Sequence, residues 1–205
     1  MFRNLLKPDS PLMITMTQIT DCIFLSLFWI LGCMPLVTAG AATAALYDAT
    51  YRGFRKGEKH PWQRFFHSFR QNLKSSLVSS VVFAVLAGML VWGGVRLWNS
   101  AVYGVVSWAV FAGGAFLIFV AVGILSILFP MLSRFENSTL QLWSNTFRLG
   151  LARLPLTLGL AAVNTVTIFL CVRYVFPLFV LPSLAALVGS LFLEPMFRPY
   201  MNEEM

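Results

Sequence analysis

Charged side chains are scarce in this sequence, in which Asp, Glu, Lys and Arg together make up 11% of the 205 residues. Soluble domains carry about a quarter charged residues, so a chain that is also 58% hydrophobic is not an ordinary soluble domain. Five long stretches contain no charge at all: 22–47, 75–95, 97–133, 154–172 and 174–193. A helix needs about 20 apolar residues to cross a bilayer, and lipid tolerates no unpaired backbone. The sequence therefore predicts an all-α polytopic membrane protein with five to six transmembrane helices.

Groups that carry out catalysis are also few. The two histidines, His60 and His67, lie in a basic segment and have no pair of carboxylates beside them. The sequence contains no G-x-x-x-x-G-K-[ST] phosphate loop. Cys22, Cys33 and Cys171 lie in apolar stretches and are odd in number, which favours free thiols over a disulfide or a metal site. We expect a protein that is not an enzyme and that has no cofactor and no bound metal.

Basic residues outnumber acidic ones by 15 to 8, which gives a net charge of +7, and most of them lie between the apolar stretches. This placement indicates membrane orientation, because cytoplasmic loops are enriched in Lys and Arg. Nucleic-acid binding is not expected, since the chain has little solvent-facing surface for a basic patch. Segment 52–74 holds seven basic residues against one acidic residue, so we expect it in the cytoplasm.

The pattern predicts a single integral membrane domain over 1–205. It divides into a first helical unit broken at Pro35 (11–51), a basic linker with an amphipathic helix (52–74), two spans (75–133), a second amphipathic helix (137–153) and a final helical hairpin (154–197). Residues 96–100 are expected to form the turn between the two spans, and the uncharged run that follows is expected to form one long helix that tilts or bends. Pro182 is expected to bend the last helix.

The number of crossings made by the first helical unit decides where the amino terminus lies. If the unit crosses twice, only Arg96 and Arg173 lie outside; if it crosses once, Arg3 and Lys7 join them. Cytoplasmic positive charge favours the first arrangement, which is our expectation, although 39–51 is short for a full span.

Small residues dominate the part of this unit that follows Pro35. Gly40 and Ala44 stand four apart, as do Ala41 and Ala45, and this spacing lets membrane helices approach closely. The contact can lie within the chain or form a face for another subunit, and both interpretations stay open. The candidates for a partner interface are Pro35, Thr38, Gly40, Ala41, Ala44, Ala45, Tyr47 and Asp48.

The small residues at 39–41 also suit the cleavage site of a signal peptide. A signal peptide carries basic residues directly before its apolar core, whereas here Asp21 adjoins that core. We therefore favour a first span that is retained.

Asp48 is an ionisable residue beside these small residues. Such a group in a membrane segment often marks a path for an ion or a substrate. It also stands four residues before Arg52, in the order that favours an ion pair on one helix face. We expect the ion pair.

Aromatic residues recur at helical spacing in the basic linker, after Pro61. Their pattern predicts an amphipathic helix with cations on its other face. The aromatic side can enter the acyl boundary of the bilayer while the cations meet anionic headgroups, or it can dock on the protein's own cytoplasmic surface. The residues expected at the membrane surface are Trp62, Phe65, Phe66, Phe69, Arg70 and Lys74.

A second helix start lies at Ser138 and Gln141, which have the spacing of a capping box. The apolar residues that follow fall on one helical stripe: Leu140, Trp143, Phe147, Leu151 and Leu154. A helix with this stripe can lie on the membrane surface or face the core.

The run PLVTAGAATAALY at 35–47 resembles the hallmark of the YesL family of bacterial integral membrane proteins. Further points of similarity are Phe65-Phe66 followed by Phe69, Arg70, Asn72 and Lys74, then Phe129-Pro130 before Arg134-Phe135, and Pro182 in the last span. The similarity covers nearly the whole chain. Members of this poorly characterised family are typically encoded beside carbohydrate importers of the ATP-binding-cassette (ABC) type and polysaccharide-degrading enzymes.

The resemblance implies a multi-pass protein of the bacterial cell membrane with an accessory role in sugar uptake, and it implies no catalytic residues. We expect a non-catalytic subunit that docks on the permease and ATPase subunits of an ABC importer, in contact with lipid, and that supports assembly, stability or gating. The alternative is a stand-alone sugar transporter. Self-association of the chain stays open.

Overall fold

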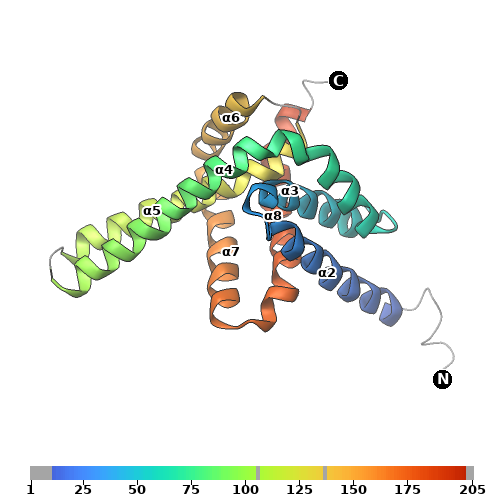
Figure 1. Cartoon of the computed structure of the whole chain (residues 1–205), viewed down its shortest axis with the longest axis horizontal. Coiled ribbons are helices and arrows are strands. Elements are labelled where there is room, and N and C mark those ends of the chain that lie inside the picture. Colours follow the sequence, from blue (N-terminus) through green and yellow to red (C-terminus); the bar gives the residue numbers. More distant parts are fainter. Residues whose placement is uncertain (1–10, 105–106, 136–137, 202–205) are drawn as a thin grey trace.

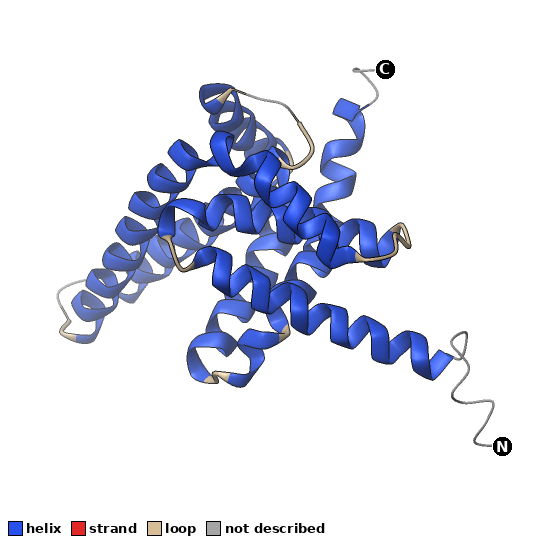
Figure 2. Cartoon of the chain, turned by 45° about the vertical axis from the view of Figure 1, so that its right-hand side comes forward, coloured by secondary structure: helices blue, strands red, loops and turns tan. Residues whose placement is uncertain are grey.

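The computed structural model describes residues 11–104, 107–135 and 138–201. In these ranges it consists of helices and short connections, with no strand (Figure 2), which confirms the predicted all-α class. The α-helices are α2 (Pro11–Cys33), α3 (Ala39–Thr50), α4 (Pro61–Val102), α5 (Trp108–Leu132), α6 (Thr139–Ala152), α7 (Leu154–Arg173) and α8 (Leu181–Met201). Short 3₁₀ turns, η1 (Leu36–Thr38) and η3 (Phe176–Phe179), precede α3 and α8, and a π-helical turn, η2 (Tyr51–Arg55), follows α3.

Pro35 ends the first helix as predicted, because proline lacks the N–H that would continue the hydrogen-bond ladder. Thr38 stands at the N-cap of α3, but its hydroxyl does not cap that helix. The hydroxyl instead donates to the carbonyl oxygens of Gly32 at 2.7 Å and Pro35 at 2.9 Å. Thr38 therefore closes the end of α2 and fixes the angle at which α3 departs.

α3 is the most enclosed helix of the described chain, with every residue from Ala44 to Thr50 buried. It packs most extensively against α4. Gly40 allows this close approach, because a β-carbon there would collide with the Ser80 hydroxyl and the Phe129 ring. The Gly40 N–H donates to the Ser80 hydroxyl oxygen at 3.1 Å, so the two backbones are joined as well as packed.

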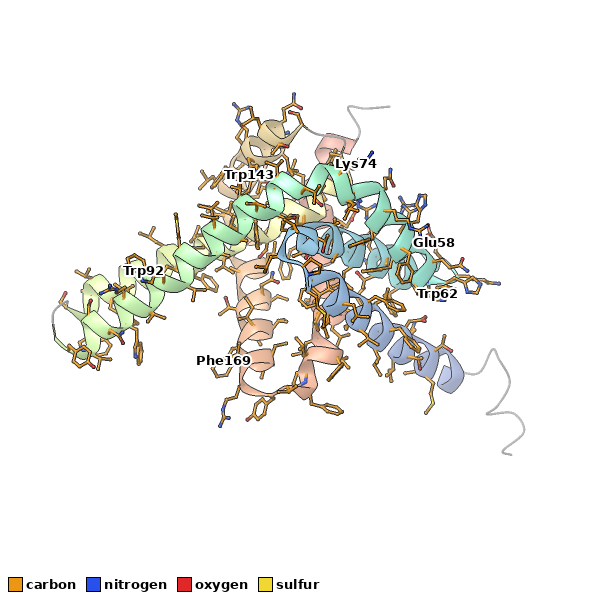
Figure 3. All side chains as sticks on the ribbon, in the orientation of Figure 1. Glu58, Trp62, Lys74, Trp92, Trp143 and Phe169 are labelled. Atoms are coloured by element: carbon orange, nitrogen blue, oxygen red, sulfur yellow. The ribbon has the colours of Figure 1, made fainter. Side chains whose placement is uncertain are left out.

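α4 is one continuous helix of 42 residues that joins the basic linker to the apolar stretch after it. Figure 1 shows that it changes direction near its first third, and Figure 3 places Lys74 at the bend. Ser75 and Ser76 donate from their hydroxyls to the carbonyls of Asn72 and Leu73, each at 3.2 Å. Serine hydroxyls that bond back to their own helix commonly bend it, which accounts for the change of direction.

The expected turn at 96–100 is wrong, because α4 continues through these residues to Val102. Asn99 and Ser100 are tolerated in the helix, and the chain turns at Gly104, whose φ of 70° suits glycine. The uncharged run at 97–133 is therefore divided between the end of α4 and α5, and it does not form one long helix. Pro130 lies in the last turn of α5, which ends two residues later.

The capping box at Ser138 and Gln141 is present at the start of α6. One prediction for the last helix is wrong. Pro182 does not bend α8 but lies in its first turn, where its fixed φ suits a helix start. The helix continues through Pro195 to Met201.

The largest core lies at one end of the molecule, where α3, α5, α6, α7 and α8 meet. Its fully buried side chains include Tyr47, Ile127, Leu128, Met196 and Phe197. From this end α2, the α4–α5 pair and the α7–α8 pair diverge (Figure 1). The outer parts of these helices expose apolar side chains such as Val91, Leu117 and Phe169, as expected for surfaces solvated by lipid.

Four described helices are long and apolar enough to cross a membrane: Thr15–Cys33 within α2, α4, α5 and α7. α8 has a shorter apolar part, Leu181–Phe197. α3 has 12 residues, which span about 18 Å at 1.5 Å per residue, well short of the about 30 Å of a hydrocarbon core. α3 by itself is therefore shorter than a full span, as the sequence indicated for 39–51.

The start of α2 lies at the same end of the molecule as the α4–α5 turn and the α7–α8 connection (Figure 1). α6 lies on the side away from these parts, and the basic linker lies at the right-hand edge, at about the height of α3 (Figure 1). The expectation that the start of α2 and the linker share one side of the membrane stays a prediction. Arg3 and Lys7, on which that expectation depended, lie outside the described residues.

Candidate functional site at the basic end

Asp48 is held by two arginines at the carboxyl end of α3. Its Oδ1 lies 2.8 Å from Arg52 Nε, and its Oδ2 lies 2.6 Å from Arg64 Nε. The carboxylate side chain is only 2% exposed. The predicted pairing with Arg52 is confirmed, and Arg64, expected on the polar face of the amphipathic helix, turns inward and ties α4 to α3. A buried carboxylate with two charge-assisted hydrogen bonds is a fixed structural group.

A second cluster gathers around Glu194 of α8. The Glu194 Oε1 accepts from the Tyr47 hydroxyl at 2.8 Å and from Arg134 Nη2 at 2.6 Å. The Arg134 guanidinium lies 4.0 Å from the centroid of the Tyr51 ring, a cation–π contact. Arg55 reaches α8 as well, donating to the Ser190 carbonyl and hydroxyl oxygens at 3.4 and 3.3 Å. The cluster therefore joins the ends of α3, α5 and α8.

The bonds of this cluster are structural, because they hold helices together. Burial, reinforced by the Glu194 carboxylate, raises the pKa of Tyr47 far above its usual value, so its hydroxyl keeps its proton and remains a donor. The Arg134 side chain is 9% exposed, and its buried Nε finds no acceptor among the described residues. No group of three or more His, Cys, Asp or Glu that could hold a metal occurs in the described ranges.

A polar cleft of about 510 Å³ opens between α4 and the end of α5. Most of its lining is polar, and its residues are Ser68, Gln71, Asn72, Ser75, Leu132, Ser133, Arg134 and Phe135. Several of these groups are already bonded, since Asn72 Nδ2 donates to Ser68 and the Ser133 hydroxyl donates to the Pro130 carbonyl. The Gln71 amide bonds to no other described residue. The cleft is thus a preformed space with free polar groups at its mouth.

The aromatic residues of the first part of α4 divide between two environments. Phe65 is buried against Leu25, Ala45 and other residues of α2 and α3, and Phe69 packs partly against the same group. Trp62 and Phe66 remain 42% exposed. The helix therefore docks on the protein through Phe65, while part of its aromatic face stays open. Arg70 and Lys74 are exposed.

The apolar stripe predicted for α6 does not face the core. Leu142, Thr146, Leu149 and Gly150 are its buried residues. The predicted apolar stripe lies largely on the outside, with Leu140 84% exposed and Leu151 58% exposed. Trp143 packs partly against the core. α6 thus presents apolar side chains on the outer surface.

Several polar residues of the apolar helices are bonded within the protein, whereas the buried Ser79 hydroxyl of α4 finds no partner among the described residues. Asn164 and Thr167 of α7 donate to the carbonyls of Leu160 and Val163, four residues earlier. Between helices, the Ser26 hydroxyl of α2 donates to the Ser183 hydroxyl of α8 at 3.0 Å. Asn164 and Thr167 are thus bonded to their own helix, and Ser26 and Ser183 join α2 to α8.

The predicted partner-interface residues fall mainly inside the chain. Those from Gly40 to Asp48 are covered by the chain's own helices, whereas Pro35 is exposed and Thr38 is half-buried. The small-residue spacing therefore serves a contact within the chain, one of the two interpretations that the sequence left open. Another protein would reach these side chains only if α4 or α8 moved.

Sequence reasoning missed Arg134 and Glu194 as members of a buried cluster. The two residues are 60 positions apart, and Tyr47 and Glu194 are 147 apart. No local spacing connects them. The available signal was the isolated charge at each position, Arg134 after an apolar run and Glu194 within an apolar helix, since such charges are commonly paired inside a membrane protein.

Fold and site together define an all-α, multi-pass membrane protein in which the carboxylates of Asp48 and Glu194 are paired with arginines. Residues 22–93 match the model of a family described as "Protein of unknown function, DUF624". This range runs from α2 into α4 and includes Asp48, Arg52 and Arg64, but not Arg134 or Glu194. The match agrees with the expected resemblance to an uncharacterised family and names no activity. No curated protein and no solved structure matches the chain.

Proposed function

We propose that the protein is a non-catalytic accessory subunit of a carbohydrate importer of the ABC type, where it supports assembly, stability or gating. The carbohydrate assignment is carried by the resemblance of 35–47 to the YesL family. The accessory role is supported by the pairing of the charged and polar groups, which leaves outer apolar faces as the features that another protein can recognise.

The exposed stripe of α6 is the surface that we assign to the importer. It lies on the side away from the α4–α5 turn and the α7–α8 connection (Figure 1), and positive charge favours this side as cytoplasmic. An importer's permease has membrane helices and cytoplasmic loops at this level, so a helix that exposes Leu140 and Leu151 offers apolar side chains to either. Contacts through a few large apolar side chains commonly carry most of the binding free energy.

Affinity purification of the tagged full-length chain from native membranes in mild detergent tests the proposal. We expect permease and ATPase subunits of one importer to co-elute in a fixed ratio. Replacement of Leu140 and Leu151 by Gln should reduce their recovery at least tenfold. Replacement of Ser144 by Ala and of Arg148 by Gln, at exposed polar positions of the same helix, should leave recovery unchanged.

A stand-alone carrier predicts the opposite results. The purified chain alone, reconstituted in liposomes, would then move radiolabelled sugar at a rate above that of empty vesicles, and native membranes would yield it without importer subunits. Those two results together would refute the accessory role.

A further inference from the structure

The cleft between α4 and α5 lies at the level where the outer surface of α4 changes character. From Arg70 to Ser75 the exposed side chains of α4 are polar, and from Leu77 to Val85 they are apolar. A transition of this kind on a membrane helix marks the boundary between the headgroup zone and the hydrocarbon core. Gln71 and Ser75 lie at this boundary and line the cleft. The mouth of the cleft therefore opens at the level of the headgroups.

The charged side chains of α4, which forms one wall of the cleft, are all basic. That helix carries no Asp or Glu along its whole length. Lys74 is a neighbour of the lining residue Gln71 on the helix surface, three residues on, and Arg70 is a neighbour of Lys74. Arg134 enters the lining from the other side, and its ion pair with Glu194 uses Nη2. Basic pockets between membrane helices on the cytoplasmic side suit anionic headgroups.

Size and surroundings favour a lipid over a free anion. A space of about 510 Å³ is within the range of small-molecule sites, about 300–1,000 Å³, and accommodates a phosphate with its glycerol. Directly along α4 from the mouth, Val78 is 60% exposed and Val82 40% exposed. Acyl chains attached to the phosphate would run along this apolar surface and bury it.

We propose that this cleft binds the headgroup of an anionic phospholipid, with its phosphate near Arg134, Gln71 and the cations Arg70 and Lys74, and with its acyl chains along Val78 and Val82. The site is separate from the α6 stripe assigned to the importer and does not depend on that assignment. A lipid in this place joins α4 to the end of α5 outside the protein core.

Lipid retention by the full-length chain is the direct test. The chain is placed in nanodiscs of equimolar phosphatidylglycerol and phosphatidylcholine, released into detergent, and examined by native mass spectrometry. We expect one retained phosphatidylglycerol per chain, preferred about tenfold or more over phosphatidylcholine because cations near a membrane surface attract anionic lipid.

Matched variants separate the cleft from general charge. Arg70→Gln with Lys74→Gln should lower retention about tenfold or more, since Lys74 neighbours the lining residue Gln71 and Arg70 neighbours Lys74 on the exposed side of the helix. Arg96→Gln, an exposed position at the far end of the same helix, should leave retention unchanged. Ser75→Trp fills the mouth and should abolish retention, whereas Ser100→Trp on the same helix should not.

Three outcomes would overturn the proposal. Equal retention of the two lipids would show that the phosphate charge is not recognised. Unchanged phosphatidylglycerol retention by a folded Ser75→Trp chain would place the lipid elsewhere. Displacement of the lipid by soluble glycerol 1-phosphate would show that the cleft takes a free phosphate and that the acyl chains contribute nothing.

Discussion

A single buried carboxylate joins two helices at the basic end of the protein. Asp48 comes from α3, Arg64 from α4 and Arg52 from the π-helical turn between them. Neither arginine is fully buried, with side-chain exposures of 31% and 28%, so both retain contact with water. The Asp48 carboxylate has almost no contact with water, and its charge is stable inside the protein only because both of its oxygens are bonded.

We predict that Asp48→Asn lowers the free energy of unfolding by about 3 kcal/mol, because removal of one partner leaves charges unpaired in a buried site. Thermal unfolding of the detergent-solubilised chain measures the effect. Glu58→Gln removes the other partner of Arg52, at 3.3 Å and 40% exposed, and should cost less than about 1 kcal/mol. Equal losses for the two variants would show that burial of Asp48 does not govern its contribution.

The pairing of Asp48 with Arg52 could be predicted from the sequence, because a separation of four residues on a helix determines which side chains meet. The bond from Arg64 to Asp48 could not. The position of Arg64 on the predicted helix groups it with the solvent-facing cations. In the structure, the docking of Phe65 on α2 and α3 turns this part of α4 so that Arg64 faces inward. The cluster of Arg134 and Glu194 depends in the same way on how distant helices pack.

At the scale of the helices, the contact between α3 and α4 organises the fold. Small side chains on α3 and serines on α4 let the two helices lie close together, and Ser76, Ser79 and Ser80 are all buried. In lipid, van der Waals packing and interhelical hydrogen bonds hold such helices together. Gly40 occupies the tightest point, between Ser80 and Phe129.

Gly40→Ala should destabilise the protein by about 1–3 kcal/mol, the usual cost of overpacking a filled core. Gly88→Ala on α4 is the matched control, since its new β-carbon meets nothing within 4 Å, and alanine is the better helix former by about 1 kcal/mol. Unfolding temperatures should therefore move in opposite directions. Combining Gly40→Ala with Phe129→Leu should recover part of the loss, and no recovery would place the strain elsewhere.

Helix boundaries were predicted well where one residue dominates them. Pro35 ends α2 and Ser138 with Gln141 starts α6 at the expected positions, because a missing N–H and a capping box act locally. The boundary at 96–100 was predicted wrongly because it was inferred from polarity. Polar residues can lie in the last turns of a helix without ending the helix. The bend of α4 was interpreted as a break between two helices for the same reason.

At the scale of the whole molecule, charge and shape divide the protein into two ends. The start of α2, the α4–α5 turn and the α7–α8 connection lie on the side away from α6 (Figure 1), and the basic linker carries seven of the chain's basic residues. Positive charge favours a cytoplasmic location for the basic linker. Because α3 alone is short for a return crossing, we predict that the start of α2 faces outward.

Labelling of single cysteines with a membrane-impermeant maleimide tests this topology, after Cys22, Cys33 and Cys171 have been replaced by Ala. Cysteines at Met16, Tyr103 and Val175, which are 60%, 80% and 74% exposed, should react in intact cells. Cysteines at Lys59 and Ser144, both exposed, should react only after permeabilisation. The position at Met16 is decisive, because a first helical unit that crossed twice would protect it in intact cells while leaving Tyr103 and Val175 reactive.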